Sequence, residues 1–291
     1  MNIFIAGTSS ILAAQLVESF FRQKATLFLC DELPRDDGAI SAALEATTAG
    51  QAMDVVMILY GDDVFYGDLK KFRRGKPATA HRRTEAICRF FAGRTKKPET
   101  LMLTSSVNIY GSASQHTADE STPSGNDFVA HYFKELEAAT RAAEDNGIRV
   151  VHMRLGTIVC RSSKPALPRL PWLPASIHAI CSDVNSRTSW ISAEDALAAV
   201  LFLLENEELS SPVNITSGDF PSRKDLFSTV KKHYGIGLML LVPSALLQCI
   251  LGRHRASLYC RSTMAMPTKL LQAGFFTQNI SLHEYLGSAH E

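Results

Sequence analysis

Short apolar runs and amphipathic stretches alternate along the first half of the chain. Five runs have the length and apolar character of buried strands, at residues 2–6, 26–30, 54–60, 100–104 and 149–154. Between them, apolar residues recur at helical spacing in three stretches, at residues 10–22, 77–91 and 127–144. We expect Ser124 or Asn126 to cap the third helix and Gly147 to end it. Strands that alternate with helices predict an α/β fold with a Rossmann-type, doubly wound parallel sheet.

The pattern changes after Gly156. Residues 162–174 hold four prolines and predict a loop or lid. We expect two further helices at residues 193–206 and 222–234, with a short strand between them at 213–216. Two small helices are expected around Leu246 and Leu270. We therefore expect a Rossmann core at residues 1–160. Residues 161–291 should form a smaller C-terminal α/β substrate lobe that packs on the core and shares its last strand and helix.

One stretch, at residues 236–252, carries no charge over 17 residues. It contains Gly237 and Pro243, and it is shorter than the roughly 20 apolar residues that a membrane-spanning helix needs. We interpret it as a buried strand followed by a helix that starts at the proline.

The amino-acid composition limits the kinds of partner that the protein is expected to bind and the cellular compartment in which it is expected. The 291 residues are 46% hydrophobic and 20% charged, enough for a sizeable core, and 30 basic against 29 acidic residues leave a net charge of +1. Without a global field we expect no membrane partner and no nucleic acid; basic runs at 70–76 and 94–97 lack a recognition motif. The six cysteines are scattered without metal-ligand spacing, so we expect reduced thiols and no metal site. The N-terminus shows no basic leader, which predicts a cytoplasmic protein.

The turn after the first strand, at residues 7–13, has the features of a dinucleotide site. A glycine turn there aims free helix N–H groups at a pyrophosphate, which the helix dipole favours. Gly7 supplies the first glycine of a G-x-x-G-x-x-G pattern, whereas Ser10 and Ala13 replace the second and third. Gly7, Ser10 and their neighbours Ser9 and Ile11 are therefore the candidate phosphate-binding residues.

Two further residues are candidates for the adenosine half of the cofactor. Asp31 ends the second strand, where a carboxylate accepts the ribose hydroxyls of NAD and repels the 2′-phosphate of NADP. NAD is thus favoured over NADP, although a solvated acidic loop would show the same residues. Gly61 follows the third strand, where a small residue lets the backbone approach the cofactor.

Residues 104–111, Thr-Ser-Ser-Val-Asn-Ile-Tyr-Gly, resemble the S-S-x-x-V-Y-G signature of extended short-chain dehydrogenases/reductases, the NAD-dependent epimerase/dehydratase group. Other segments resemble an atypical branch of that superfamily named "epimerase family protein", which ends in a small C-terminal domain of unknown function. These segments are 127–130 with 137–139, 154–156, 189–191 with Asp195, and 266–267 with 273–275.

The resemblance implies a chemistry based on Ser, Tyr and Lys, in which Ser binds the substrate oxygen, Tyr transfers a proton and Lys lowers the pKa of Tyr. It makes Ser106 and Tyr132 the catalytic candidates and places Ser105 beside the cofactor. Leu136 stands where the lysine is expected, and Lys134 points elsewhere on the helix.

An alternative register, anchored on Glu137, puts Val129 and Phe133 at the Tyr and Lys positions. Neither register restores the lysine, and the atypical branch lacks the usual pair as well. The substrate candidates that the resemblance implies are Tyr110, Arg187 and Trp190.

Two functional hypotheses follow from these residues. The first is an NAD(P)-dependent oxidoreductase or epimerase that acts on a small carbonyl or alcohol with an incomplete Ser/Tyr/Lys set. The second is a non-catalytic nucleotide sensor or protein-interaction module that kept the Rossmann fold. The chain is expected to act on a small molecule and is compatible with a homodimer.

Overall fold

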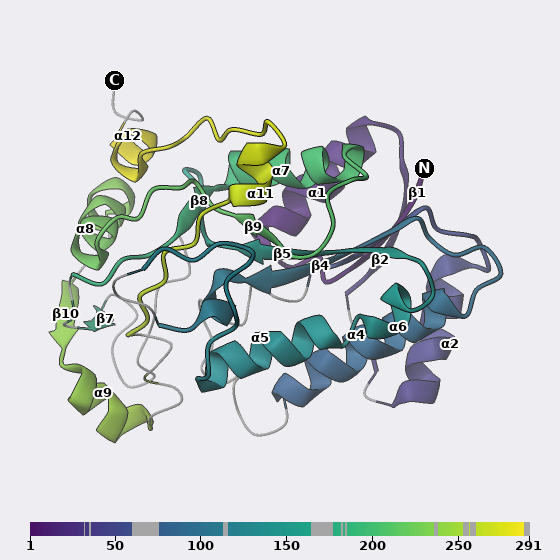
Figure 1. The fold of residues 1–291 in the computed structure, drawn as a ribbon, viewed down its shortest axis with the longest axis horizontal. Helices are drawn as coiled ribbons and strands as arrows, with labels where there is room; N and C mark the ends of the chain where they lie inside the picture. The colour runs from purple at the N-terminus through teal and green to yellow at the C-terminus, as the bar shows by residue number, and fades with distance from the viewer. Residues whose placement is uncertain are drawn as a thin grey trace.

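The computed structural model describes residues 1–31, 33–34, 36–59, 76–112, 116–163, 177–181, 183, 185–235, 238–252, 256 and 260–287. At its centre lies a parallel sheet of six strands in the order β2-β1-β3-β4-β5-β9 (Figure 1). The strands are β1 (Asn2–Ala6), β2 (Thr26–Cys30), β3 (Val55–Ile58), β4 (Thr100–Ser106), β5 (Arg149–Leu155) and β9 (Val213–Ile215). The predicted doubly wound parallel sheet is confirmed.

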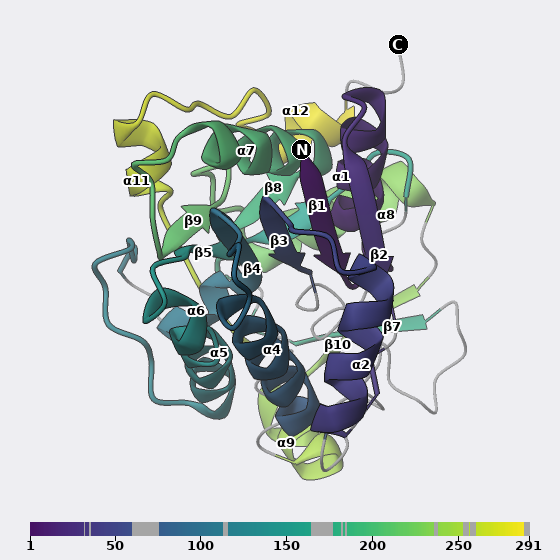
Figure 2. The same ribbon diagram turned by 90° about the vertical axis from the view of Figure 1, so that its right-hand side faces the viewer.

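Helices cover both faces of this sheet (Figures 1 and 2). One face carries α1 (Ile11–Arg22) and α7 (Ala193–Glu205). The other carries α2 (Asp37–Thr48), α4 (Lys76–Ala92), α5 (Phe128–Ala138) and α6 (Arg141–Glu144). Because successive strand residues point to opposite faces, β1 sends Ile3 and Ile5 toward α1 and sends Phe4 toward α4, where it meets Phe91.

The winding of the chain reverses at β1. The chain runs from β1 outward to β2, then crosses back to β3 on the other side of β1 and continues through β4 to β5. Backbone hydrogen bonds tie the ends of these strands together, from the Gly7 N–H to the Cys30 carbonyl and from the Leu59 N–H to the Ala6 carbonyl. A reversal of this kind opens a crevice at the carboxyl ends of the strands, where such sheets bind ligands.

The C-terminal part returns to the core and then builds a smaller unit. Strand β9 lies beside β5, so residues beyond 160 complete the central sheet. Strand β6 (Thr157–Val159) pairs with β8 (Trp190–Ser192), and a separate apolar cluster joins them to α8 (Arg223–Tyr234) and α12 (Leu282–Gly287). The remaining elements are the turn η1 (Val107–Tyr110), β7 (Ile177–Cys181), β10 (Leu238–Val242), α9 (Ser244–Leu251) and α11 (Thr268–Gln272).

Two details of the helices differ from the expectation. The alanine-rich helix α2 was not anticipated; Asp36 is its N-cap, and the Asp36 carboxylate accepts a hydrogen bond from the Ala39 N–H. Asp127, not Ser124 or Asn126, caps α5 and accepts from the Val129 and Ala130 N–H groups.

The helix expected at 127–144 is also interrupted. The Thr140 hydroxyl donates to the Glu137 carbonyl and contacts His152 Nε2 at 2.8 Å, and the chain restarts after this residue as α6. A hydroxyl that competes for a helical carbonyl is a common cause of such a break.

The uncharged stretch at 236–252 is also different from the expectation. It does form a strand, β10, and a helix, α9, that starts after Pro243. The strand is not buried: Leu238 is 54% exposed and Leu241 is 62% exposed. Among the described residues, no helix has the length and apolar character needed to cross a membrane. Most of the proline-rich stretch at 162–174 and the first basic run, at 70–76, lie outside the described residues apart from the backbone of residue 76.

Candidate functional site

The turn between β1 and α1 contains four of the predicted cofactor residues. Gly7 has a φ of +86°, a left-handed conformation that favours glycine. Ser10 is the N-cap of α1, and its Oγ accepts a hydrogen bond from the Ala13 N–H at 3.0 Å. Within the part of the chain that the structure describes, the N–H groups of Ile11 and Leu12 have no protein acceptor. These two donors are therefore available for an anion at the helix N-terminus.

Ser10 occupies the second glycine position of the pattern in a specific way. Its hydroxyl is directed back into the helix by the cap, and the side chain is only 8% exposed. A serine there therefore stabilises α1, but it leaves a Cβ where the pattern has only a hydrogen atom. Ser9, by contrast, is exposed on the same turn.

Asp31 lies next to this turn, as expected from its position after β2. Its Oδ1 accepts from the Thr8 N–H at 2.9 Å and also from the Thr8 hydroxyl. The carboxylate thus links the end of β2 to the turn that follows β1, at the strand edge where the sheet reverses. Gly61, the other adenosine-side candidate, lies outside the described residues.

The two serines at the end of β4 face opposite sides of the sheet. Ser105 is buried and donates to Glu137 Oε1 at 2.6 Å, so its side chain points toward α5 and not toward the turn at Gly7. Ser106 is half-buried, and its Oγ accepts from the backbone N–H and the side-chain amide of Asn108.

Helix α5 presents an apolar face to the sheet at the positions where the superfamily chemistry is expected. Val129, Phe133 and Leu136 are at most 1% exposed. Tyr132 is 4% exposed and packs on the rings of His81 and Phe133, with centroids 4.8 and 5.1 Å away.

Burial raises the pKa of the Tyr132 phenol, which is opposite to the lowering that proton transfer near neutral pH requires. The proposed role of Tyr132 as an acid is therefore not supported by its position. Lys134 is exposed on the opposite face, and both registers of the motif place apolar or buried side chains against the sheet.

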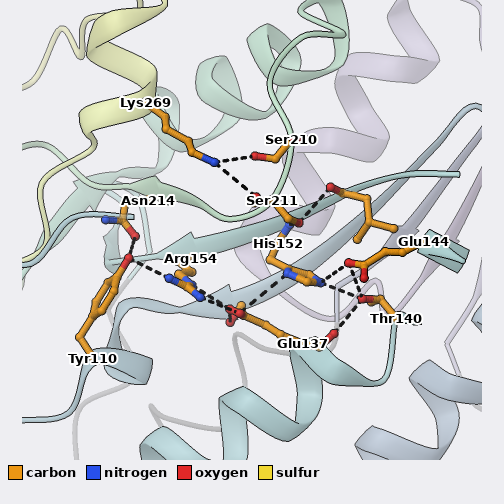
Figure 3. A network of polar contacts seen from close by, with 12 residues as sticks. Tyr110, Glu137, Thr140, Glu144, His152, Arg154, Ser210, Ser211, Asn214 and Lys269 are labelled. Carbon is orange, nitrogen blue, oxygen red and sulfur yellow. Dashed lines mark hydrogen bonds and ion pairs between the residues drawn. The ribbon is translucent and has the colours of Figure 1, made fainter. Parts of the chain in front are cut away.

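A buried network of polar side chains lies beneath the carboxyl ends of β4 and β5 (Figure 3). Its centre is a two-point ion pair: Arg154 Nε donates to Glu137 Oε1 at 2.9 Å and Arg154 Nη2 donates to Oε2 at 2.8 Å. Arg154 Nη1 also donates to the Tyr110 hydroxyl, which donates to Asn214 Oδ1 at 2.7 Å. Tyr110, a predicted substrate residue, is 7% exposed, and its hydroxyl bonds to these two partners within the protein.

The charges of this network fix the protonation states of its members. Burial alone would raise the pKa of Glu137, but the hydrogen bonds and the positive charge of Arg154 hold that pKa below its usual value. Burial lowers the pKa of His152 to about 4, against the opposing attraction of Glu137. His152 is therefore neutral near pH 7.

The substrate candidates in the C-terminal part lie in different surroundings. Trp190 is fully buried, packs on Tyr285 at 5.8 Å between ring centroids, and donates its indole N–H to Asp219 Oδ2. Its position is that of a core residue, so a direct contact with substrate is not supported. Arg187 is exposed and donates from Nη1 to the Phe220 carbonyl.

Arg261, which no sequence motif singles out, connects the N-terminal core with the C-terminal part of the chain. Arg261 is 7% exposed; its Nη1 donates to Asp127 Oδ1 at 2.7 Å and its Nη2 donates to the Asn108 carbonyl at 2.6 Å. It therefore links the C-terminal segment to the cap of α5 and to the turn after β4. Nothing in its local sequence distinguishes it from a surface arginine.

The described geometry is that of a Rossmann-type nucleotide fold with a glycine turn at the N-terminus of α1. Among the described residues, α5 does not present the tyrosine and lysine pair that the superfamily uses for catalysis. No family model matches the chain. The chain is 27% identical over 286 residues to the epimerase family protein YfhF of Bacillus subtilis, a match that covers 94% of this chain and 93% of that protein. It is 29% identical to the epimerase family protein Mb2239 of Mycobacterium bovis over 65% of this chain and 63% of that protein.

Solved structures agree with these relatives. The human epimerase family protein SDR39U1 with NADPH matches with a TM-score of 0.79 at 17% identity, over 99% of this chain and 98% of that one. UDP-glucose 4-epimerase of Thermus thermophilus in complex with NAD matches with a TM-score of 0.71 at 13% identity, over 99% of this chain and 100% of that one. The predicted resemblance to proteins named epimerase family protein is confirmed by the curated relatives, and the solved structures show that the chain shares their Rossmann-type fold.

The neutral state of His152 predicts a pH-dependent stability. As pH falls below 6.5, the unfolded chain binds a proton at this residue, whereas the folded chain resists protonation until about pH 4. The free energy of unfolding should therefore fall by about 1–2 kcal/mol between pH 7 and pH 5 through this residue alone. Urea unfolding of the wild type and of His152→Gln at several pH values measures it. An equal slope in both proteins contradicts the prediction.

The buried ion pair between Glu137 and Arg154 predicts that substitutions at the two residues have strongly non-additive effects on stability. Removing either charge leaves the other buried and uncompensated, so Glu137→Gln and Arg154→Met should each lower the free energy of unfolding by about 3 kcal/mol. The double variant should lose at least ~1 kcal/mol less than the sum of the single losses, measured by denaturant unfolding. Additive losses would show that the two side chains act independently.

Proposed function

We propose that the chain binds a nicotinamide dinucleotide along the carboxyl ends of β1, β2 and β4, with the pyrophosphate at the N-terminus of α1. The observation that carries this proposal is the pair of N–H donors at Ile11 and Leu12, without a protein acceptor in the described part of the chain, beside the left-handed turn at Gly7. These donors fit an anion. Two proteins of the same fold, human SDR39U1 and the Thermus epimerase, are solved with NADPH and NAD.

Within this proposal the ligand is NAD rather than NADP. Asp31 is exposed at the end of β2, and Thr8 holds its carboxylate beside the turn. A carboxylate there accepts hydrogen bonds from ribose hydroxyls and repels a 2′-phosphate.

The bound dinucleotide would supply hydride transfer, and the chain's own residues decide whether it is used. The apolar face of α5 supports a nucleotide-responsive, non-catalytic role, because Val129 and Phe133 are buried and Tyr132 is buried beside His81 of α4. Burial raises the pKa of the Tyr132 phenol, which disfavours its holding or moving a proton at a substrate oxygen.

A second candidate function is the oxidoreductase or epimerase activity on a small carbonyl or alcohol. It rests on Ser106, which is half-buried at the end of β4 and could polarise a substrate oxygen. Oxidation of NADH that depends on an added carbonyl compound and is abolished in Ser106→Ala would support this activity. Loss of the same oxidation in Tyr132→Phe would restore Tyr132 as the acid.

Calorimetry with NADH and with NADPH tests the proposed ligand. We expect NADH to bind more tightly, and Asp31→Ser to reduce the ratio of the two affinities by about tenfold, because the change removes one charge near the 2′ position. Glu18→Gln removes an exposed carboxylate from α1, 63% exposed, and is the matched control. The proposal fails if neither dinucleotide binds at millimolar concentration.

The Ser10 side chain predicts a difference between two small substitutions. Ser10→Gly and Ser10→Ala both remove the hydroxyl cap, but only glycine also removes the Cβ near the phosphate. We expect Ser10→Gly to bind NADH several-fold more tightly than Ser10→Ala. Ser10→Ala should in addition lose about 1 kcal/mol of stability through the cap. Equal NADH affinities, measured by titration calorimetry, would show that the Cβ does not limit access.

A further inference from the structure

One end of the molecule exposes apolar side chains that the fold does not use. Among the described residues, ten large hydrophobic side chains are exposed, and four of them lie in β10 and α9: Leu238, Leu240, Leu241 and Leu246. We call these four the leucine end. Figure 1 shows β10, β7 and α9 together at one extreme of the long axis, opposite α2.

The strand of the leucine end is exposed on both faces. Side chains alternate along a strand, so Leu238 and Leu240 point to one face of β10 and Leu241 points to the other. Their exposed fractions are 54%, 36% and 62%. Strand β10 pairs with β7 alone in the described part of the chain, and a sheet of two strands needs further cover to be stable in water.

The helix that follows adds a further exposed leucine. Of the residues of α9 whose side chains the structure describes, only Leu247 is buried, whereas Leu246 is 49% exposed. A cluster of exposed leucines of this kind marks a surface that contacts something apolar.

Basic residues lie at the entrance to this surface. Lys231 and Lys232 are exposed in the last turn of α8, which leads through Gly235 into β10. The chain then carries no charge from residue 236 to residue 252. One exposed acid, Asp183, follows β7 at the opposite, carboxyl end of the small sheet. The leucine end is therefore apolar, with positive charge on one flank.

We propose that the leucine end binds the surface of an anionic membrane. Leucine side chains enter the boundary between headgroups and acyl chains, and Lys231 and Lys232 contact anionic headgroups. This is a contact with the surface and differs from a membrane span, for which the uncharged stretch is too short. If the proposal holds, it replaces the expectation that the protein has no membrane partner.

The charge pattern favours a membrane over a second copy of the chain. A second copy of the chain would also bury the leucines, but a two-fold contact between identical patches makes no specific use of the lysine pair. An anionic lipid surface is complementary to both features, the exposed leucines and the lysine pair beside them in the chain.

Sedimentation with lipid vesicles tests the proposal on the full chain. We expect binding to phosphatidylcholine vesicles that contain about 30 mol% phosphatidylglycerol, and weak binding to phosphatidylcholine alone. Leu238→Ser/Leu241→Ser should weaken partitioning at least about tenfold, since each leucine loses apolar contact with lipid. Lys231→Gln/Lys232→Gln should weaken it about tenfold and remove its dependence on salt.

Matched controls separate the leucine end from general stickiness. Phe21→Ser/Phe276→Ser removes two side chains that are 75% and 70% exposed elsewhere, and Lys96→Gln/Lys134→Gln removes two other exposed lysines. Both control variants should bind vesicles like the wild type, and circular dichroism checks that every variant folds. The lysine variant keeps the test valid if the leucine variant unfolds.

Three results overturn the proposal. These are the absence of binding to the anionic vesicles, equal binding by the wild type and the lysine variant, and a stable dimer by light scattering that Leu238→Ser/Leu241→Ser dissociates. The last result would assign the leucine end to a second copy of the chain.

Discussion

The charge pair between Glu137 and Arg154 is the interaction on which the carboxyl end of this sheet depends. Two ions removed from water are costly unless each is well paired, and here both carboxylate oxygens receive guanidinium hydrogen bonds while Ser105 supplies another. The pair joins α5 to β5, and through the Tyr110 hydroxyl and Asn214 it reaches η1 and β9. Five elements are thereby held in one arrangement at the edge where a dinucleotide would lie.

The same anchor explains why the catalytic expectation and the structure differ. Glu137 fixes the rotation of α5, so Phe133 and Val129, one and two turns earlier, face the sheet. Tyr132 is turned instead toward His81 of α4. In this chain those side chains are apolar or buried. The spacing from Ser106 to a tyrosine is visible in the sequence, but whether that tyrosine reaches solvent depends on what packs over it. The ring of His81 in α4 packs on Tyr132, and the sequence around either residue does not predict this contact.

The spacing of apolar residues and the alternation of strands with helices predicted most of the fold. A strand buried on both faces must be apolar throughout, and a helix that flanks the sheet must be apolar on one side. The same logic fails for α2, whose alanines give little contrast between its faces, and for β10. The five apolar residues of β10 are expected to be buried, yet Leu238, Leu240 and Leu241 are exposed. Burial of a strand requires other elements packed on its faces, which the apolar character of the strand itself does not provide. At Asp127, several neighbouring residues were equally able to cap the helix. Arg261, 134 residues away, contacts the one that does.

The position of β9 bears on how the chain folds as it is synthesised. The hydrogen bonds of Arg154 to Glu137 and Tyr110 can form as soon as β5 has been synthesised. Asn214, which accepts a hydrogen bond from the Tyr110 hydroxyl, follows some 60 residues later in β9. Until then the outer edge of β5 has no neighbour, and one side of the buried charge pair stays in water. Contacts of such long sequence separation form late and slowly. The N-terminal half is therefore an incomplete folding unit, whose edge must be shielded while the remainder of the polypeptide leaves the ribosome.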